Sequence, residues 1–231
     1  MALLLACSVA GVLLYWFVTL PDVSILTQAD PPTTTFIEAR KAEVVGTGRS
    51  FMLRWIWMPL PRISPHLQRA VIVAEDATFY RHEGFDWEGL KEAVTRNWKK
   101  GTLHRGGSTI TQQLAKNLYL SADKSLFRKV HEALITWKLE RFLTKKRILE
   151  LYLNVAEWGR GIYGAEAAAR HYFHKAAEDL SPDEAALLAA MLPAPRQYDP
   201  LQITPYLARR QKEILYWMRK ADRPIGKNHS P

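Results

Sequence analysis

Residues 75 to 84 read EDATFYRHEG, and residues 106 to 117 read GGSTITQQLAKN. The first stretch gathers acids, a histidine and a glycine, and the second gathers a glycine pair, hydroxyls, amides and a lysine. Both stretches lie where a helical pattern of apolar residues breaks, so their polar groups are concentrated at helix ends. Such a concentration is typical of a functional site rather than of a core.

Glu75 and Asp76 end an apolar helix that contains residues 70 to 74. At least one of the two carboxylates is expected at the edge of the core, where burial raises its pKa toward that of a useful base. An ordinary pair of solvated acids would give the same sequence, and a histidine such as His82 is more often a hydrogen-bonded scaffold residue than a catalyst. The residues alone leave these alternatives open.

The glycine pair Gly106-Gly107 directly precedes a helix that we expect to begin at Ser108. Free backbone N–H groups and the positive end of the helix dipole favour an anion or a sugar oxygen at that point. Apolar residues recur every four positions on this helix and are expected to face the core: Ile110, Leu114 and Leu118. Polar residues are expected on its other faces, where amides can hold sugar hydroxyls and a lysine can hold a phosphate: Gln112, Gln113 and Lys116.

A longer helix, from Ser125 or Ala122 to about Leu143, is expected to carry a charged stripe. The stripe consists of residues four apart and one beside them: Lys124, Arg128, Glu132 and Lys129. The opposing apolar face is expected to hold Val130, Ala133, Leu134 and Trp137. A surface ion pair worth roughly 0.3–0.5 kcal/mol is the simpler interpretation, but a cation that precedes its acid is the less favourable order on a helix. The stripe therefore favours a binding role.

The remaining start and stop signals also indicate helices, and no alternating strand pattern or internal repeat is present. These helices are expected at residues 64–75, 86–100, 144–154 and 181–192, and from Thr204-Pro205 onward. The predicted fold class is therefore mostly α. With 231 residues, of which 48% are hydrophobic, the chain can bury one sizeable core, so we expect a single globular domain.

The net charge of +9 suits nucleic acid, an anionic membrane surface or a phosphorylated substrate. The single cysteine, Cys7, lies in an apolar segment, which excludes an internal disulfide and a thiolate metal site in the domain.

Residues 2 to 20 carry no charge and no proline, and their length suits a helix across ~30 Å of hydrocarbon. We therefore predict a transmembrane helix at residues 1–20, a tether at 21–49 and a globular domain at 50–225. A cleaved signal peptide is the alternative, although it would have a basic region before the apolar run. The acidic flank after the span favours an exported domain, which argues against nucleic acid. The apolar run at residues 51–59 suits either the lipid interface or a buried strand.

Together these segments resemble the glycosyltransferase module of the bacterial peptidoglycan polymerases. Residues 75–84 fit the family pattern E-D-x-x-F-x-x-H-x-G, and residues 106–117 fit G-G-S-T-I-T-Q-Q-L-x-K-N, at every fixed position. Further similar segments lie at residues 128–132, 139–140, 148–154, 163–169 and 192–200. The segment at residues 155–159 and the lack of a transpeptidase domain resemble the monofunctional, membrane-anchored enzymes of Gram-negative bacteria.

The resemblance implies a lysozyme-like helical domain with a membrane-facing part, held at the bacterial inner membrane with its catalytic domain in the periplasm. The implied substrates are lipid II and the growing lipid-linked glycan strand, joined with inversion and loss of undecaprenyl pyrophosphate. No cofactor is required, although a divalent cation such as Mg²⁺ could bind at the pyrophosphate. Proteins of cell division or wall synthesis are the other implied partners, and nucleic acid is not one.

The resemblance also implies residue roles. Glu75 is the base that takes the proton of the 4-hydroxyl, and Glu132 orients the cations or a bound divalent ion. Four cations would hold the leaving pyrophosphate: Lys116, Lys124, Arg128 and Lys129. Further contacts with the substrate are implied for Asp76, Phe79, His82, Gly107, Ser108, Thr109, Gln112, Gln113 and Asn117.

Two other functions are compatible with parts of the sequence. A lysozyme-like hydrolase would need an acid to protonate a poor leaving oxygen, whereas a pyrophosphate leaves without that proton. One carboxylate plus a basic cluster therefore fits transfer better than hydrolysis. A tethered scaffold that binds anionic lipid would explain the charge and the apolar segment, but not the two motifs.

Overall fold

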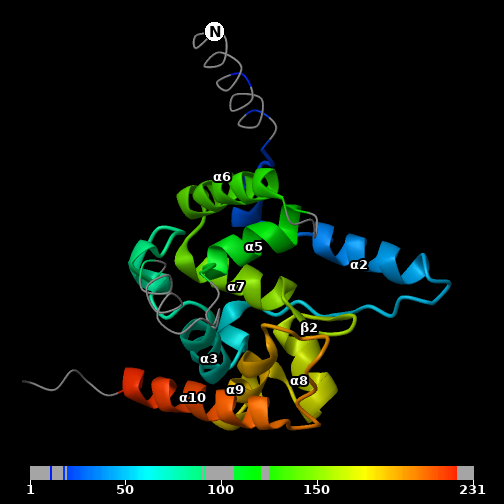
Figure 1. Ribbon diagram of the computed structural model, residues 1–231, viewed down its shortest axis with the longest axis vertical. Coiled ribbons are helices and arrows are strands. Elements are labelled where there is room, and N and C mark those ends of the chain that lie inside the picture. Colours follow the sequence, from blue (N-terminus) through cyan, green and yellow to red (C-terminus); the bar gives the residue numbers. More distant parts are fainter. Residues whose placement is uncertain are drawn as a thin grey trace, which may run out of the picture.

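The computed structural model describes residues 11, 18, 20–89, 91, 107–120 and 125–222. Within that part the chain is mostly helical, which confirms the predicted class (Figure 1). The α-helices are α2 (Thr35–Val45), α3 (Pro65–Glu75), α5 (Ile110–Tyr119), α6 (Leu126–Phe142), α7 (Lys145–Val155), α8 (Ala165–Phe173), α9 (Pro182–Met191) and α10 (Pro205–Asp222). Short 3-10 helices are η1 (Ser24–Thr27), η2 (Leu60–Arg62), η3 (Phe79–Arg81) and η4 (Ala177–Asp179).

Hydroxyl side chains cap the helices at the positions that the sequence indicates. The side chains of Ser64, Ser125 and Thr144 accept the backbone N–H groups at the starts of α3, α6 and α7. A capping box begins α9, which confirms the helix expected from residue 181. α5 begins one residue later than expected because its cap is Thr109 rather than Ser108. The expected helix at residues 86–100 lies largely outside the described residues.

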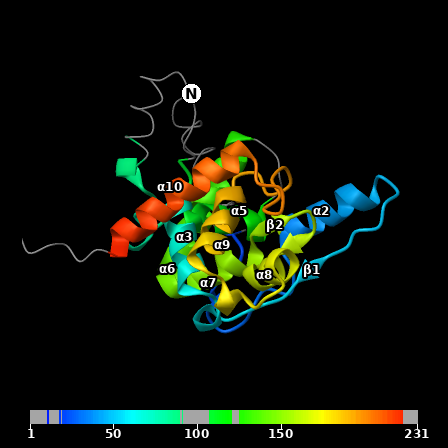
Figure 2. The ribbon, with the colours of Figure 1, turned by 90° about the horizontal axis from the view of Figure 1, so that it is seen from below.

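The helices form two groups that share one core (Figure 1). In the upper group α5 packs against α6, α7 and α2, and in the lower group α3, α9 and α10 pack against one another. Seen from below, α10 runs across α9 and α3 (Figure 2). Glu75 ends α3 in the lower group, whereas Lys116 lies on α5 in the upper group. The boundary between the two groups is therefore where the residues of both motifs can meet.

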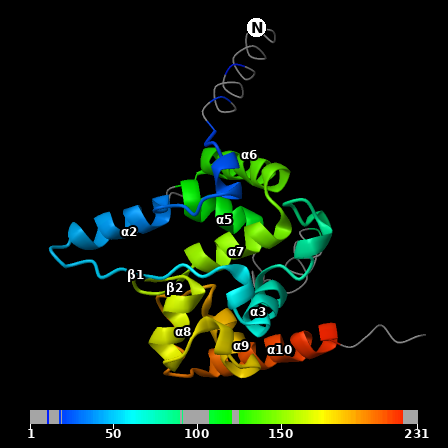
Figure 3. The ribbon, with the colours of Figure 1, turned by 180° about the vertical axis from the view of Figure 1, so that it is seen from behind.

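A small sheet, which the sequence did not predict, lies beside the helices. Its order is β1 (Arg54–Trp55), β3 (Ile162–Tyr163) and β2 (Glu157–Gly159), with β1 parallel and β2 antiparallel to β3. Two or three residues per strand are too few for an alternating pattern to appear. The indole Nε1 of Trp55 donates to the backbone oxygen of Asn154 at 2.7 Å. The segment is therefore docked on the domain as a short strand, but it is not buried, because Met52, Leu53 and Ile56 are exposed. The lipid-interface alternative for residues 51–59 stays open, and an extended path leads from α2 through β1 to α3 (Figure 3).

The structure differs from the expected tether at residues 21–49. This segment forms η1 and α2, and its apolar side chains Val23, Leu26 and Ile37 are buried. The hydroxyl of Thr35 donates to the backbone oxygen of Leu118 at 3.0 Å, which fixes α2 to the end of α5. This helix has no clear sequence signature, because only Ile37 of α2 is fully buried and no apolar period develops.

The apolar face predicted for α6 is also corrected. Val130 and Trp137 are exposed, and the buried face of the helix consists of Glu132, Ile135, Thr136 and Leu139. A charged residue is thus buried where the sequence suggested a solvated stripe. Ion pairs within the protein explain this burial, as described below.

Among the described residues, no helix is both long and apolar enough to cross a membrane. The predicted transmembrane helix at residues 1–20 falls almost wholly outside the described part of the chain, so it remains a prediction.

Candidate active site

Glu75 ends α3 and faces α5. Its Oε2 accepts a hydrogen bond of 2.7 Å from the side-chain amide of Gln113, and the hydroxyl of Tyr152 donates to the Oε1 of Gln113 at 3.0 Å. The protein around Glu75 raises the pKa of its carboxyl, because burial disfavours the charged form. The amide of Gln113 and the charges of Arg210 and Lys116 oppose this effect. The raised pKa of Glu75 suits a general base. Part of the residue also remains exposed.

Asp76, the next residue, has both of its carboxylate oxygens engaged by other groups of the protein. Its two carboxylate oxygens lie 2.9 Å from Nε2 of His82 and 3.0 Å from the backbone nitrogen of Ile110, the first residue of α5. The hydroxyl of Thr109 donates to the backbone oxygen of Gly84 at 2.7 Å. The residues of the first motif therefore hold the N-terminus of α5 against the end of α3. This arrangement places Gln113 and Lys116, one and two turns further along α5, beside Glu75.

Lys116 connects the carboxylate to a group of cations. Burial lowers the pKa of its ammonium, while Glu132 and Glu75 raise it and Arg128 and Lys129 lower it. Because all four residues act on Lys116, the base and the predicted cations share one neighbourhood. Lys116 therefore lies near the base on one side and near the cations of α6 on the other.

Glu132 organises the cations of α6. Its carboxylate accepts a hydrogen bond of 2.7 Å from Arg128 and another from Lys129, and Lys129 also lies 3.3 Å from the hydroxyl of Ser108. Only 3% of the Glu132 side chain is exposed, so these charge-assisted contacts offset its burial. The expected ion pair is present, but it is buried at the acid rather than lying on the surface.

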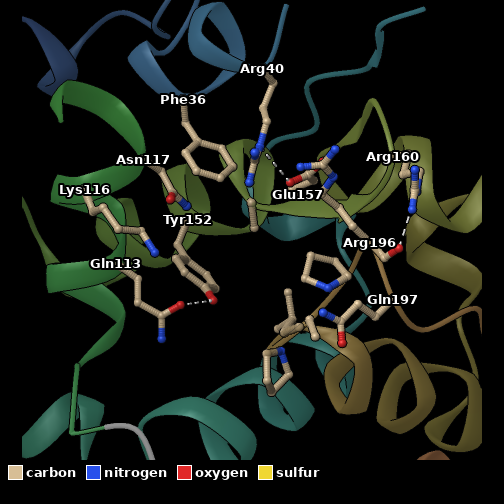
Figure 4. A pocket seen from close by; sticks show the side chains of 15 residues that line it. Phe36, Arg40, Gln113, Lys116, Asn117, Tyr152, Glu157, Arg160, Arg196 and Gln197 are labelled. Carbon is tan, nitrogen blue, oxygen red and sulfur yellow. Dashed lines mark hydrogen bonds and ion pairs between the residues drawn. The ribbon is translucent and has the colours of Figure 1, made fainter. Parts of the chain in front are cut away.

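An open cavity of about 510 Å³ lies between α5 and the loop after α9 (Figure 4). Gln113, Lys116 and Asn117 line it from α5, and Tyr152 lies at its base. Glu75 is not in its wall but is bonded directly to Gln113, which is. The side chain of Gln113 therefore lies between the cavity and the base, Glu75.

Not all predicted residues have surface to offer a substrate. Phe79 is fully buried in the core with the ammonium of Lys145 4.6 Å from its ring centre, so its predicted substrate contact is wrong for this structure. Gln112 was expected to point outward but is buried, because its side chain completes the capping box with Thr109. Asp76 and His82 are held by each other, and their direct contact with substrate remains a prediction.

The other predicted residues differ in how much surface they offer to a substrate. Asn117 is nearly buried but lines the cavity. Gly107 and Ser108 precede α5 and keep exposed surface beside Lys129. Lys124 lies outside the described residues, so its role stays a prediction.

The structure adds cavity residues that sequence reasoning did not assign to the site. They come from three separate segments: Phe36, Arg40, Tyr152, Glu157, Arg160, Arg196 and Gln197. Tyr152 and Glu157 lie within motifs that carried the resemblance, and that signal could have identified them. Nothing in the sequence pointed to Phe36 and Arg40, because their segment was expected to be a tether.

The described residues do not supply a ready metal site. No group of three or more histidine, cysteine, aspartate or glutamate side chains comes together among them. Glu132, which was expected to orient the cations or a bound divalent ion, accepts from Arg128 and Lys129. Its donor set therefore fits an anion held by the cations better than a metal held by the carboxylate.

A desolvated carboxylate beside a group of lysine and arginine side chains suits a transferase, in which a base would activate a hydroxyl and cations would receive an anionic leaving group. A family model described as transglycosylase matches residues 44–219. The chain therefore belongs to the transglycosylase family and is a glycosyltransferase.

Curated relatives match nearly the whole chain. The chain is 50% identical over 222 residues to the biosynthetic peptidoglycan transglycosylase of Dechloromonas aromatica (strain RCB), covering 96% of each chain. It is 55% identical over 185 residues to the protein of the same name from Aromatoleum aromaticum (strain DSM 19018 / LMG 30748 / EbN1), covering 80% of each chain. For the protein of that name from Nitrosospira multiformis (strain ATCC 25196 / NCIMB 11849 / C 71), the identity is 46% and the coverage is 94% of each.

Proposed function

We propose that this protein is a monofunctional peptidoglycan glycosyltransferase that polymerises lipid II into glycan strands. The observation that carries the proposal is the position of Glu75, a carboxylate of raised pKa that is bonded to Gln113 and lies in the field of Lys116. Relatives along nearly the full length carry the name of that activity. We further propose an inner-membrane location, with residues 1–20 as the anchor, a lysozyme-like domain in the periplasm and wall-synthesis proteins as partners.

In the proposed reaction the 4-hydroxyl of lipid II attacks the anomeric carbon of the lipid-linked donor strand. Glu75 takes the hydroxyl proton, a contribution typically worth ~10²–10⁴ in rate. The bond from the anomeric carbon to the pyrophosphate oxygen breaks with inversion, and undecaprenyl pyrophosphate leaves with the electron pair. Lys116, Arg128 and Lys129 offset the charge that develops on the diphosphate.

Glu132 acts as a positioning residue in this scheme, because its oxygens hold Arg128 and Lys129 rather than facing the base. A divalent ion at the diphosphate is compatible with the reaction, but no step requires it. Hydrolysis would require a second carboxyl group that protonates a sugar oxygen. The carboxylates near Glu75 are engaged elsewhere, Asp76 with His82 and Ile110, and Glu132 with the cations.

The purified full-length chain incubated with labelled lipid II tests this function. We expect the wild type to form long glycan strands with or without a chelator. We expect the Glu75→Gln variant not to form them. Soluble fragments released from preformed cell wall, without polymer from lipid II, would instead identify a hydrolase. Binding to anionic vesicles without either activity would favour the scaffold.

A further inference from the structure

Three arginines lie across the main cavity from Lys116 and have no part in the reaction described above (Figure 4). Arg40 comes from α2, Arg160 from the turn between β2 and β3, and Arg196 from the loop after α9. Lys116 enters the same cavity from α5 on the opposite wall. The cavity is therefore bounded by cations on two sides, of which only the Lys116 side is close to the base.

The positive charge of this arginine cluster (Arg40, Arg160 and Arg196) is incompletely matched by carboxylates. Arg40 makes a close contact of 2.6 Å with Glu43, but Arg196 approaches Glu43 only to 3.6 Å. Glu157 lies 3.8 Å from Nε of Arg40, beyond hydrogen-bonding distance. Burial raises the pKa of Glu157 despite its arginine neighbours. Three cations thus share two acids, and most of the contacts are long.

Arg160 is the least paired of the three. Within the described part of the chain it has no carboxylate partner, and its Nε reaches only the backbone oxygen of Arg196 at 3.4 Å. Its side chain is exposed at the rim of the cavity. An exposed guanidinium with unused N–H groups is available to an incoming anion, and its planar donor geometry suits a carboxylate.

Arg40 is held in place before any ligand arrives. Its guanidinium lies 4.8 Å from the ring centre of Phe36 and is tied to Glu43 one turn along α2. A side chain fixed in this way loses little rotamer entropy when it binds. The segment expected to be an irregular tether therefore presents a fixed cation to the cavity.

The cluster also marks where two cavities join. A second cavity of about 310 Å³ adjoins the first and shares four lining residues with it: Arg40, Glu157, Arg160 and Arg196. An extended substrate that fills the first cavity can continue past the arginines into the second. The cluster therefore lies where a long ligand would pass from one cavity into the other.

We propose that Arg40, Arg160 and Arg196 form a subsite for the carboxylates of the peptide carried on the glycan strand. This proposal rests on the proposed function and specifies which part of its substrate the second wall of the cavity binds. The lipid-linked diphosphate is the other anion in such a substrate, and Lys116, Arg128 and Lys129 already account for it.

The position of the cluster favours the peptide over a diphosphate. The chain enters the described domain beside α6, where Lys138 donates to the backbone oxygen of Pro21 at 2.8 Å. If the preceding residues anchor the protein in a membrane, that membrane would therefore lie on the α6 side. The lipid of any substrate would lie on the same side. Arg40 lies on α2 in the upper group, but Arg160 comes from the β2–β3 turn and Arg196 from the loop after α9, both farther from α6 (Figure 1). An anion that meets them is carried by the sugars, away from the lipid.

Steady-state polymerisation with two substrates tests the subsite. One is lipid II with free peptide carboxylates, and the other is lipid II in which those carboxylates are amidated. The wild type is compared with an Arg160→Gln/Arg196→Gln double variant, which leaves the structural contacts of Arg40 intact. The control is Arg62→Gln, because Arg62 is an exposed arginine that pairs with Glu178 and lines neither cavity.

For the wild type we expect a KM roughly tenfold higher with the amidated substrate, as the loss of one charge-assisted contact predicts. The double variant should show that higher KM with both substrates and an unchanged kcat, while Arg62→Gln behaves as the wild type. Equal KM values for the two substrates in the wild type would overturn the proposal. The proposal would also be overturned if inorganic pyrophosphate inhibited the wild type competitively but did not inhibit the double variant. The subsite would then bind a diphosphate. A wild type that polymerises neither substrate would refute the proposed function itself.

Discussion

The side-chain amide of Gln113 donates a 2.7 Å hydrogen bond to the carboxylate of Glu75, although the two residues are 38 positions apart in the chain. Gln113 is oriented in turn by the hydroxyl of Tyr152, which donates to its oxygen at 3.0 Å. The amide therefore favours the ionised form of Glu75, while burial favours the neutral form. The balance between these two effects sets the pH range in which Glu75 can act as a base.

Replacing Glu75 with Gln should lower polymerisation of lipid II by ~10²-fold or more, because the base is lost while the shape is kept. The variant should fold normally. Since the folded-state pKa of Glu75 is raised, its ionisation costs stability above the ordinary value of 4.5, and that cost disappears at lower pH. The Tm of the variant at pH 7 should therefore equal or exceed that of the wild type. Near-normal turnover would contradict the assignment of the base.

Replacing Gln113 with Leu should move the acid limb of the kcat/KM profile to higher pH. The variant removes the donor that stabilises ionised Glu75, so the pKa of the carboxyl rises further. A pH–rate profile measures the shift directly. Tyr152→Phe is the matched control, because it keeps the amide and removes only the hydroxyl that orients it, so a smaller shift is expected. An unshifted acid limb in Gln113→Leu would show that another group controls it.

Replacing Lys116 with Met should separate activity from stability. Burial lowers the pKa of the Lys116 ammonium, so its charge costs stability below the folded-state pKa, and the cost vanishes as the pH rises above the ordinary value of 10.5. Removing the charge should leave the Tm at pH 7 unchanged or higher. Turnover should fall at least tenfold, because the leaving diphosphate loses a cation. Thermal unfolding and polymerisation assays on one preparation check both effects, and a fall in Tm with normal turnover would contradict the role.

Replacing Asp76 with Asn should destabilise the fold by about 1–3 kcal/mol, the usual cost of leaving a buried partner unsatisfied. The amide oxygen can still accept from the N–H of Ile110, but the NH2 group can meet His82 only in the tautomer whose Nε2 accepts, whereas the carboxylate accepts from both partners. Denaturant unfolding measures the loss. If unfolding is unchanged while KM rises, Asp76 contacts substrate directly and its main role is not structural.

The first motif shows how far sequence reasoning extends. Residues 75–84 predicted an acid at the end of an apolar helix, and that helix, its cap at Ser64 and its end at Glu75 are present. The same pattern did not distinguish the base from the residues that support it. Phe79 and Gln112 belong to the motifs because they fill the core and cap α5, and a single sequence carries no sign of which side chains face inward at a helix junction.

The local sequence by itself determined the starts of α3, α6, α7, α9 and α10, the mostly α class and the pairing of an acid with a basic stripe, because caps and apolar periods act over a few residues. Only the tertiary structure decided that α2 packs onto α5, that Glu132 is buried among its cations, and that Arg40, Arg160 and Arg196 meet on one wall of the cavity. Those arrangements depend on contacts between residues up to 156 positions apart in the numbering, from Arg40 to Arg196. No local period encodes them, since they arise when the two groups of helices close on a common core.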